Sequence, residues 1–352
     1  MGQKDRPNYW KNAALLTGSD VVLRLAGLGL RIGLANALGG EGMGLYQLVL
    51  AVYGLFVTLA TAGISVAATR LLTEELSRDA ASARGMLRRL LALGAGLGVL
   101  AMAAQAGLDI IKQGGNAIDA AIATAACMTV LEPTSNGIGS DAFALVWTKG
   151  ELHGLNASGR APMAITAEKV KKQGYTAMPK RGWIPVMVPG APSAWAELSE
   201  KFGRLTLEKV MEPAVTYARE GYPVSPVISK LWNNAYKEFS GTLKDECFKP
   251  WFDTFARDGH APQPGEIWKS EAHAKTLEKI AKTHAKAFYQ GELGDQIDAY
   301  SRKTGGYLRK SDLENYWCEW VKPIHVNYRG YDVCEIPPNG DGIIALMALN
   351  IL

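Results

Sequence analysis

The sequence predicts an α+β protein in which about three transmembrane-type α-helices precede a mixed segment of helices and strands. Two observations support this prediction. No charged residue occurs between Glu41 and Arg70, which is typical of membrane-spanning helices. From Ala106 onward, helix and hairpin signals alternate with glycine-containing turns, which is typical of an α+β domain. The composition changes near Met102, so we expect two domains, residues 1–103 and 104–352.

Charge is distributed unevenly between these two parts. Of the 38 Lys and Arg and the 34 Asp and Glu, residues 1–103 hold 10 and 6, which leaves 28 of each sign in the remainder. A basic excess confined to an apolar segment indicates contact with membrane lipid, and the absence of basic patches with interleaved aromatics argues against nucleic-acid binding. The four cysteines and five histidines show no metal-ligand spacing, so we expect no metal and no cofactor.

Three apolar segments make up the expected membrane part, at residues 13–38, 45–67 and 90–108. About 20 apolar residues suffice to cross a bilayer, and the second and third segments carry no charge. The first contains Arg24 and Arg31, which share a helix face and would point into a bundle interior or a wet cavity. The alternative is a partly buried amphipathic helix of a soluble protein.

Basic residues precede the first segment and lie between the second and third, which places both stretches on the cytoplasmic side. Three spans would then carry residues 104–352 to the outer side of the membrane. If the N-terminal segment is not a genuine part of the protein, we expect the enzyme-like segment in the cytoplasm instead.

Residues 12–102 resemble the start of the polysaccharide-exporter and sporulation-protein flippases of the MATE-like superfamily. The most specific matches are the G-x-x-G-x-Y turn within residues 39–46 and the G-I-S-x-A-x-x-R helix end at residues 63–70. The resemblance implies transporters with two six-helix halves around a central cavity. Three helices cannot form that cavity, so the resemblance implies a membrane anchor at most.

The second part begins with a helix and a hairpin. Asn116 follows two glycines and is placed to cap a helix over residues 117–131. A strand at residues 142–148 then leads through the turn Lys149-Gly150 into a second strand at residues 151–156.

Further elements follow in order. We expect helices at residues 193–202, 207–221 and 271–288, a hairpin of strands 324–328 and 331–336 around Arg329-Gly330, and a last helix after the 337–342 loop. The 271–288 helix is amphipathic and carries His284 near its apolar stripe, where we expect a core-edge histidine more than a catalytic base.

Residues 107–352 look like the large-subunit portion of the gamma-glutamyltransferase family. The matching motifs, in the family's order, are GLDIIKQGGNAIDAAIA, EPTSNGIGSDAF, NASGRAP, VPGAPSAW, EPAVTYAREGYPVSP, GGYLRKSDLENY and YRGYDVCEIPPNGDGIIALMALNIL. The resemblance implies a partial αββα sandwich of the N-terminal-nucleophile (Ntn) hydrolase fold. It also implies an amide-cleaving acyltransferase or hydrolase that acts on a gamma-glutamyl or related small-molecule amide.

The resemblance implies a precursor that cleaves itself and thereby exposes a threonine. The threonine hydroxyl attacks the amide and its own α-amine serves as the base. No Thr-Thr-His run occurs in this sequence, and Thr283-His284 is expected in the middle of a helix. We therefore assign no catalytic residue, and expect the chain to be inactive without a missing small subunit.

Two residues are candidates for substrate binding. The glutathione-hydrolysing members carry an arginine four positions before the Ala-Pro proline, which grips the glutamate α-carboxylate. Ser158 occupies that position here, and Arg160 follows two residues later. On a strand this shift keeps the side chain on the same face but moves it about 6.6 Å. Arg160 therefore either meets a carboxylate or forms a structural pair, and the acyl donor stays open.

Ser140 replaces a glycine that the family usually carries beside Asp141. If that position requires φ > 0, serine costs on the order of 1 kcal/mol. Three readings of the whole chain remain: a gamma-glutamyltransferase-type large chain, a fragment of a membrane lipid-linked-polysaccharide flippase, and a non-functional join of two gene fragments.

Overall fold

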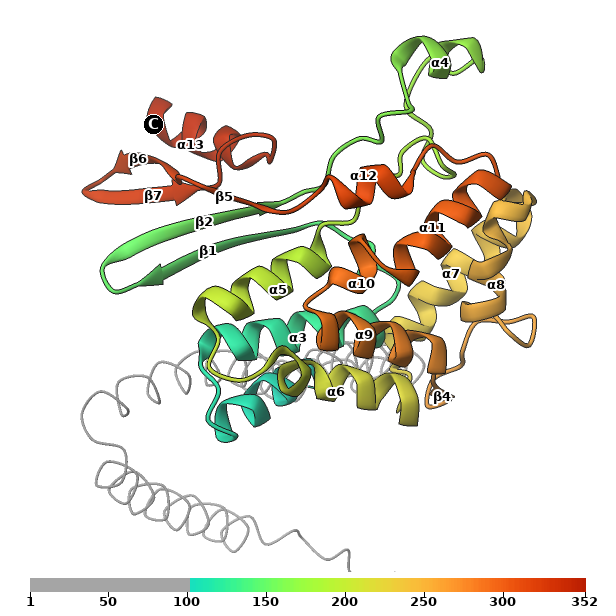
Figure 1. Cartoon of the computed structure of the whole chain (residues 1–352), viewed down its shortest axis with the longest axis horizontal. Coiled ribbons are helices and arrows are strands. Elements are labelled where there is room, and N and C mark those ends of the chain that lie inside the picture. Colours follow the sequence, from blue (N-terminus) through green and yellow to red (C-terminus); the bar gives the residue numbers. More distant parts are fainter. Residues whose placement is uncertain (1–101) are drawn as a thin grey trace, which may run out of the picture. The chain divides into compact units, whose positions relative to one another are not determined.

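The computed structural model of the chain describes residues 102–352. The first and second predicted membrane segments lie outside this range, as does most of the third. The described residues form helices, one three-stranded sheet and two short two-stranded sheets. Figure 1 shows most of the helices gathered beside the strands. The α+β class predicted for this part of the chain is therefore confirmed.

The central helices form the main core. Residues 102–112 are helical, and α3 (Ala117–Leu131) contacts α6 (Leu207–Glu220), which in turn contacts α9 (Glu271–Thr283). Alanines and aliphatic side chains fill the space between these helices, and the buried cluster includes the methionine Met211. Small residues let the helix backbones approach closely, which explains the alanine-rich sequence of α3.

The cap predicted for α3 is present. The Asn116 side chain accepts hydrogen bonds from the amides of Ile118 (2.9 Å) and Asp119 (3.0 Å), and the Asp119 carboxylate accepts from the Asn116 amide at 2.9 Å. This reciprocal capping box satisfies orphan donors at the helix start. The fully buried Asp119 also accepts from the amide of Arg204 at 3.0 Å, so it ties α3 to the loop before α6.

The main sheet has the strand order β1-β2-β5, all antiparallel. Strands β1 (Ala142–Thr148) and β2 (Glu151–Ala157) pair along their full length around Lys149 and Gly150, which both have positive φ as a tight hairpin turn requires. Strand β5 (Glu319–Val321) pairs with the end of β2. This hairpin confirms the sequence prediction.

The two faces of this sheet differ in their cover. Leu155 and Ala157 of β2 pack with Ala194 of α5 (Ala191–Phe202) in a buried cluster. On the other face, side chains of β1 are exposed, and Trp147 is 69% exposed. Within the described residues, only one edge of β1 has a partner strand. The arrangement is thus one sheet covered by helices on one side.

The remaining elements surround this frame. They are α4 (Ala167–Lys172), β3 (Tyr222–Pro223), α7 (Pro226–Thr242), η1 (Glu246–Phe248), α8 (Lys249–Phe255), β4 (Ile267–Trp268), α10 (Lys286–Tyr289), α11 (Glu292–Lys303), α12 (Lys310–Glu314), β6 (Ile324–Tyr328), β7 (Tyr331–Glu335) and α13 (Gly342–Ile351). The second hairpin, β6–β7, and the last helix agree with the sequence prediction.

The prediction of one helix over residues 271–288 is wrong. Helix α9 ends at Thr283 because His284 (φ 47°) and Ala285 (φ 61°) adopt left-handed conformations. The Ala285 amide donates to the carbonyl of Ile280 at 2.8 Å, which closes the helix end, and α10 begins at Lys286. His284 is exposed at this corner and is not the core-edge residue we expected.

The end of the third predicted membrane segment also differs from expectation. Ala103 and Ala106 are buried in the main core, together with Ile110 from the same helix. These residues contact protein side chains, so the helix serves the α+β domain at this point. Among the described residues, no helix combines the length and apolar character needed to span a bilayer.

Candidate functional site

The candidate site lies where β2 ends. Asn156, Ser158 and Arg160 follow one another at this point. The Asn156 side chain donates to Oδ1 of Asn339 at 2.9 Å, and the Asn339 amide donates to the Ser158 hydroxyl at 2.7 Å. Asn339 belongs to the loop between β7 and α13, so Ser158 and Asn339, which are 181 residues apart, meet here through polar side chains.

The turn at residues 158–160 is held by two close glycine contacts. A Cβ on Gly159 would lie 2.0 Å from the carbonyl oxygen of Val188, and Gly159 has φ +81°. A Cβ on Gly190 would lie 1.7 Å from the carbonyl oxygen of Ala157. The Val188 amide also donates to the Arg160 carbonyl at 2.9 Å. Both glycines are therefore required, because any side chain there would separate the turn from the start of α5.

Two buried tyrosines support the same turn. The Tyr316 hydroxyl accepts from the Gly159 amide at 3.2 Å. The Tyr289 hydroxyl donates to the Pro189 carbonyl at 2.7 Å and accepts from the Ser193 amide at 3.1 Å. Burial raises the pKa of both tyrosines, so the hydroxyls stay neutral and their hydrogen bonds persist across the physiological range.

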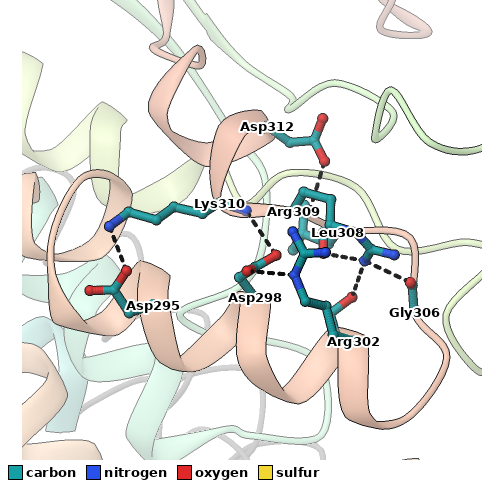
Figure 2. Close-up of polar contacts among 9 residues, drawn as sticks. Asp295, Asp298, Arg302, Gly306, Leu308, Arg309, Lys310 and Asp312 are labelled. Carbon is teal, nitrogen blue, oxygen red and sulfur yellow. Dashed lines mark hydrogen bonds and ion pairs between the residues drawn. The ribbon is translucent and has the colours of Figure 1, made fainter.

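A polar network orders the segment that precedes Tyr316. Figure 2 shows Arg309 directly before α12 and Lys310 as the first residue of α12, both beside α11. The Lys310 amide donates to Asp298 at 3.2 Å, and the Arg309 guanidinium donates to the Gly306 carbonyl at 2.8 Å. The buried Asp312 carboxylate accepts from the Arg309 amide at 2.8 Å. The GGYLRKSDLENY motif thus fixes α12, and through it the position of Tyr316.

The structure places the two predicted substrate-binding residues differently from each other. Ser158 is half-buried and is hydrogen-bonded to Asn339. Arg160 is exposed and forms an ion pair with Glu319 of β5. Strand β2 ends at Ala157, so the strand spacing we assumed between these residues does not apply. Of the two roles left open for Arg160, the structural pair is present.

Sequence reasoning missed three residues of this site, which are Tyr316, Glu319 and Asn339. Tyr316 and Asn339 lie inside motifs that carried the family resemblance, but the motifs do not show that these side chains contact the turn at residues 158–160. Glu319 lies just outside them.

The expected strain at Ser140 is absent, because Ser140 does not adopt a positive φ. Its carbonyl accepts from the amides of Gly190 (3.0 Å) and Ala191 (2.9 Å), and its hydroxyl accepts from the Gly137 amide at 3.1 Å. Ser140 therefore helps to hold the start of α5 beside the site. Among residues 102–352, no group of three His, Cys, Asp or Glu side chains has the geometry to hold a metal ion.

Comparison with known proteins gives two family matches. The gamma-glutamyltranspeptidase family model matches residues 103–352, and the polysaccharide biosynthesis protein model matches residues 9–107. The chain is 37% identical over 255 residues to the glutathione hydrolase-like YwrD proenzyme of Bacillus subtilis, covering 71% of this chain and 47% of that protein. It is 31% identical over 257 residues to the glutathione hydrolase proenzyme of a Pseudomonas species, covering 71% and 44%.

Solved structures agree with these matches. The crystal structure of cephalosporin acylase from Bacillus halodurans is similar with a TM-score of 0.70 and 62% identity, over 71% of this chain and 47% of that one. The gamma-glutamyltranspeptidase of Helicobacter pylori is similar with a TM-score of 0.63 and 30% identity, over 68% and 69%. The chain spans about half the length of the curated relatives it matches. Residues 103–352 make this chain a member of the gamma-glutamyltranspeptidase family of Ntn-hydrolases.

Proposed function

We propose that this chain supplies the large-subunit part of an amide-cleaving, acyl-transferring site. The observation that carries the proposal is the fixed turn at residues 156–160, held by glycine contacts, by Tyr316 and by Asn339 within the family's matched region. Such a turn presents polar groups in one geometry, which is what binding and orienting a substrate requires. The substrate is a gamma-glutamyl amide or a related small amide.

The nucleophile of this proposal is a threonine on a second polypeptide, the small subunit. Its hydroxyl oxygen attacks the amide carbon, and its free α-amine takes the hydroxyl proton and passes it to the departing amine. An ester to the threonine forms, and water or an amine then takes the acyl group. No Thr-Thr-His run occurs in the sequence, so the chain alone is inactive in this scheme.

Arg160 is the proposed contact for a substrate carboxylate. The Arg160 side chain is 62% exposed and that of its partner Glu319 is 58% exposed, so both remain within reach of a ligand. A bidentate contact from an arginine suits a carboxylate, and Glu319 competes for it. Ser158, which is hydrogen-bonded to Asn339, provides a hydroxyl group two positions before Arg160.

The acyl donor is a choice between two classes. The glutathione hydrolases among the relatives favour a gamma-glutamyl donor, whereas the 62% identical cephalosporin acylase favours the acyl group of a cephalosporin amide. The replacement of the expected arginine by Ser158 supports the second class.

The proposal is tested by mixing this chain with the small chain of the Bacillus halodurans acylase, starting at the threonine that self-cleavage exposes. A chromogenic gamma-glutamyl anilide and a cephalosporin amide serve as substrates. Turnover of either amide by the mixture, and none by each chain alone, is the expected result. Arg160→Gln should lower turnover by about tenfold or more, whereas the exposed control Arg204→Gln should leave it unchanged.

Two outcomes would contradict the proposal. Turnover by this chain alone, with a covalent acyl adduct on it, would show that it already holds a nucleophile. An inactive mixture beside an active complete acylase would show that the large-subunit site does not form.

We also propose that residues 1–103 anchor the chain in a membrane, with residues 104–352 on the outer side. The uncharged segments and the family match over residues 9–107 support this proposal. Fractionation of expressing cells, with protease added outside, tests it: the chain should sediment with membranes and lose its second part. Recovery in the supernatant would contradict the anchor, and independent sequencing across codons 100 to 105 would expose a join of two fragments.

A further inference from the structure

The segment between β2 and α5 projects from the domain. We call residues 161–187 the arm; in Figure 1 its helix α4 stands apart from the other helices. No residue of α4 is buried. Four large apolar side chains of the arm are exposed, and among them Met163 is 88% and Met178 65% exposed. Apolar side chains that cluster on a surface often mark a binding site.

The arm forms a groove of about 920 Å³. Its walls are mainly aliphatic and come from both ends of the arm; they include Ile165, Val170, Ile184 and Val186, with Lys171 and Tyr175 as polar members. Small-molecule sites typically have volumes of roughly 300–1,000 Å³, mostly apolar walls and a few polar groups. The groove has these properties.

The base of the groove is fixed and adjoins the candidate site. The Met163 amide donates to the buried Asp312 carboxylate at 3.0 Å, and Asp312 is held by the network of Figure 2. The Arg160 carbonyl and the Val188 amide are hydrogen-bonded at 2.9 Å, and the next residue on each side, Ala161 and Met187, lines the groove. The groove therefore begins one residue beyond Arg160.

Charge distinguishes the arm from the rest of the domain. The arm holds five Lys and Arg residues and one Glu. The remainder of residues 104–352 holds 23 Lys and Arg and 27 Asp and Glu residues. The Lys169 ammonium donates to the Ala164 carbonyl at 2.6 Å and is committed to the arm itself. Lys171 lines the groove, and within the described part of the chain it makes no ion pair. The Lys171 ammonium is therefore available to pair with an anionic group of a ligand in the groove.

We propose that the groove binds the apolar body of a small carboxylate, with Lys171 beside its negative group. In the proposed reaction this ligand is the apolar part of the amide substrate, and only that assignment rests on the proposed function. Binding itself needs no nucleophile and no small subunit, so it is measured on the full chain alone.

The test compares two soluble probes, 4-phenylbutyrate and its neutral amide, by titration calorimetry on the full chain. The carboxylate should bind more tightly than the amide. Lys171→Gln should weaken carboxylate binding by roughly three- to fivefold and leave amide binding unchanged, because it removes one exposed charge. Val170→Glu should weaken both probes, because it places a charge in an apolar wall.

Two exposed residues of α7 provide matched controls. Lys230→Gln makes the same change outside the groove, and Leu231→Glu makes a comparable apolar-to-acidic change there; both should leave the two affinities unchanged. Equal effects of the groove and control variants, or no saturable binding, would overturn the proposal. Amide turnover by the mixed chains with no probe binding would overturn the proposed groove site and leave the proposed function intact. Probe binding without turnover would support the groove site and contradict the proposed function.

Discussion

The contact between Gly190 and Ala157 makes a quantitative prediction. Gly190 has φ −100° and ψ −33°, a conformation open to any residue, so Gly190→Ala adds only a steric conflict. The new Cβ would lie 1.7 Å from the Ala157 carbonyl oxygen, so the two backbones must separate by about 1.7 Å to reach ordinary contact. The obstacle is the backbone of β2, which cannot turn aside as a side chain can.

Overpacking of this kind costs typically 1–3 kcal/mol where neighbours can adjust, so we expect Gly190→Ala to cost about 3 kcal/mol. For a domain of this size that corresponds to a melting temperature lower by roughly 6–12 °C, measured by circular dichroism. Gly241→Ala is the matched control: Gly241 lies in α7, and its Cβ would meet nothing within 4 Å. Alanine should raise stability there by about 0.5–1 kcal/mol. Equal melting temperatures for the two variants would refute the reasoning.

Three further predictions concern charge and titration. Glu319→Gln should change stability by less than about 1 kcal/mol, because the ion pair between Arg160 and Glu319 is exposed. The same change frees Arg160 and should lower the KM for a carboxylated amide in the mixed-chain assay. An unchanged KM would argue against a contact between Arg160 and the substrate carboxylate. Burial lowers the pKa of His273 below its ordinary value of 6.5, so the contribution of this neutral side chain to stability is complete above that pH and is lost as the pH falls through the pKa of the folded protein. His273→Asn should therefore flatten the decline in the free energy of unfolding below about pH 6.5. An unaltered decline would contradict this. Burial raises the pKa of Cys127 to about 12, so a maleimide at pH 8 should label Cys334 well before it, and equal rates would count against the buried position.

Much of the second domain could be predicted from local sequence signals. Asn116 and the hairpin turn at Lys149-Gly150 specify their own geometry through capping and positive φ, so those elements were right. The helix break at His284 could not be predicted, because alanine disfavours the left-handed region and the modest tendency of histidine toward it does not specify a break. The packing of Phe288 and Tyr289 into the core makes the turn favourable there.

The candidate site was predicted in part. Ser158 and Arg160 were identified because they stand at a comparable position of a motif. Their partners come from β5 and the 337–342 loop, and no local signal in the sequence joins residues so far apart. The ion pair between Arg160 and Glu319 depends on strand pairing between β2 and β5, which is a property of the whole fold.

The helix at residues 102–112 has a practical consequence for how this chain is divided. The two family matches overlap at residues 103–107, inside a helix whose Ala103 and Ala106 are buried in the main core. A recombinant enzyme piece that starts at Gly107 would lose both alanines and open a hole beside α3, so expression boundaries belong before Met102. The residues shared by the two family matches therefore belong to the packed core of the described part of the chain.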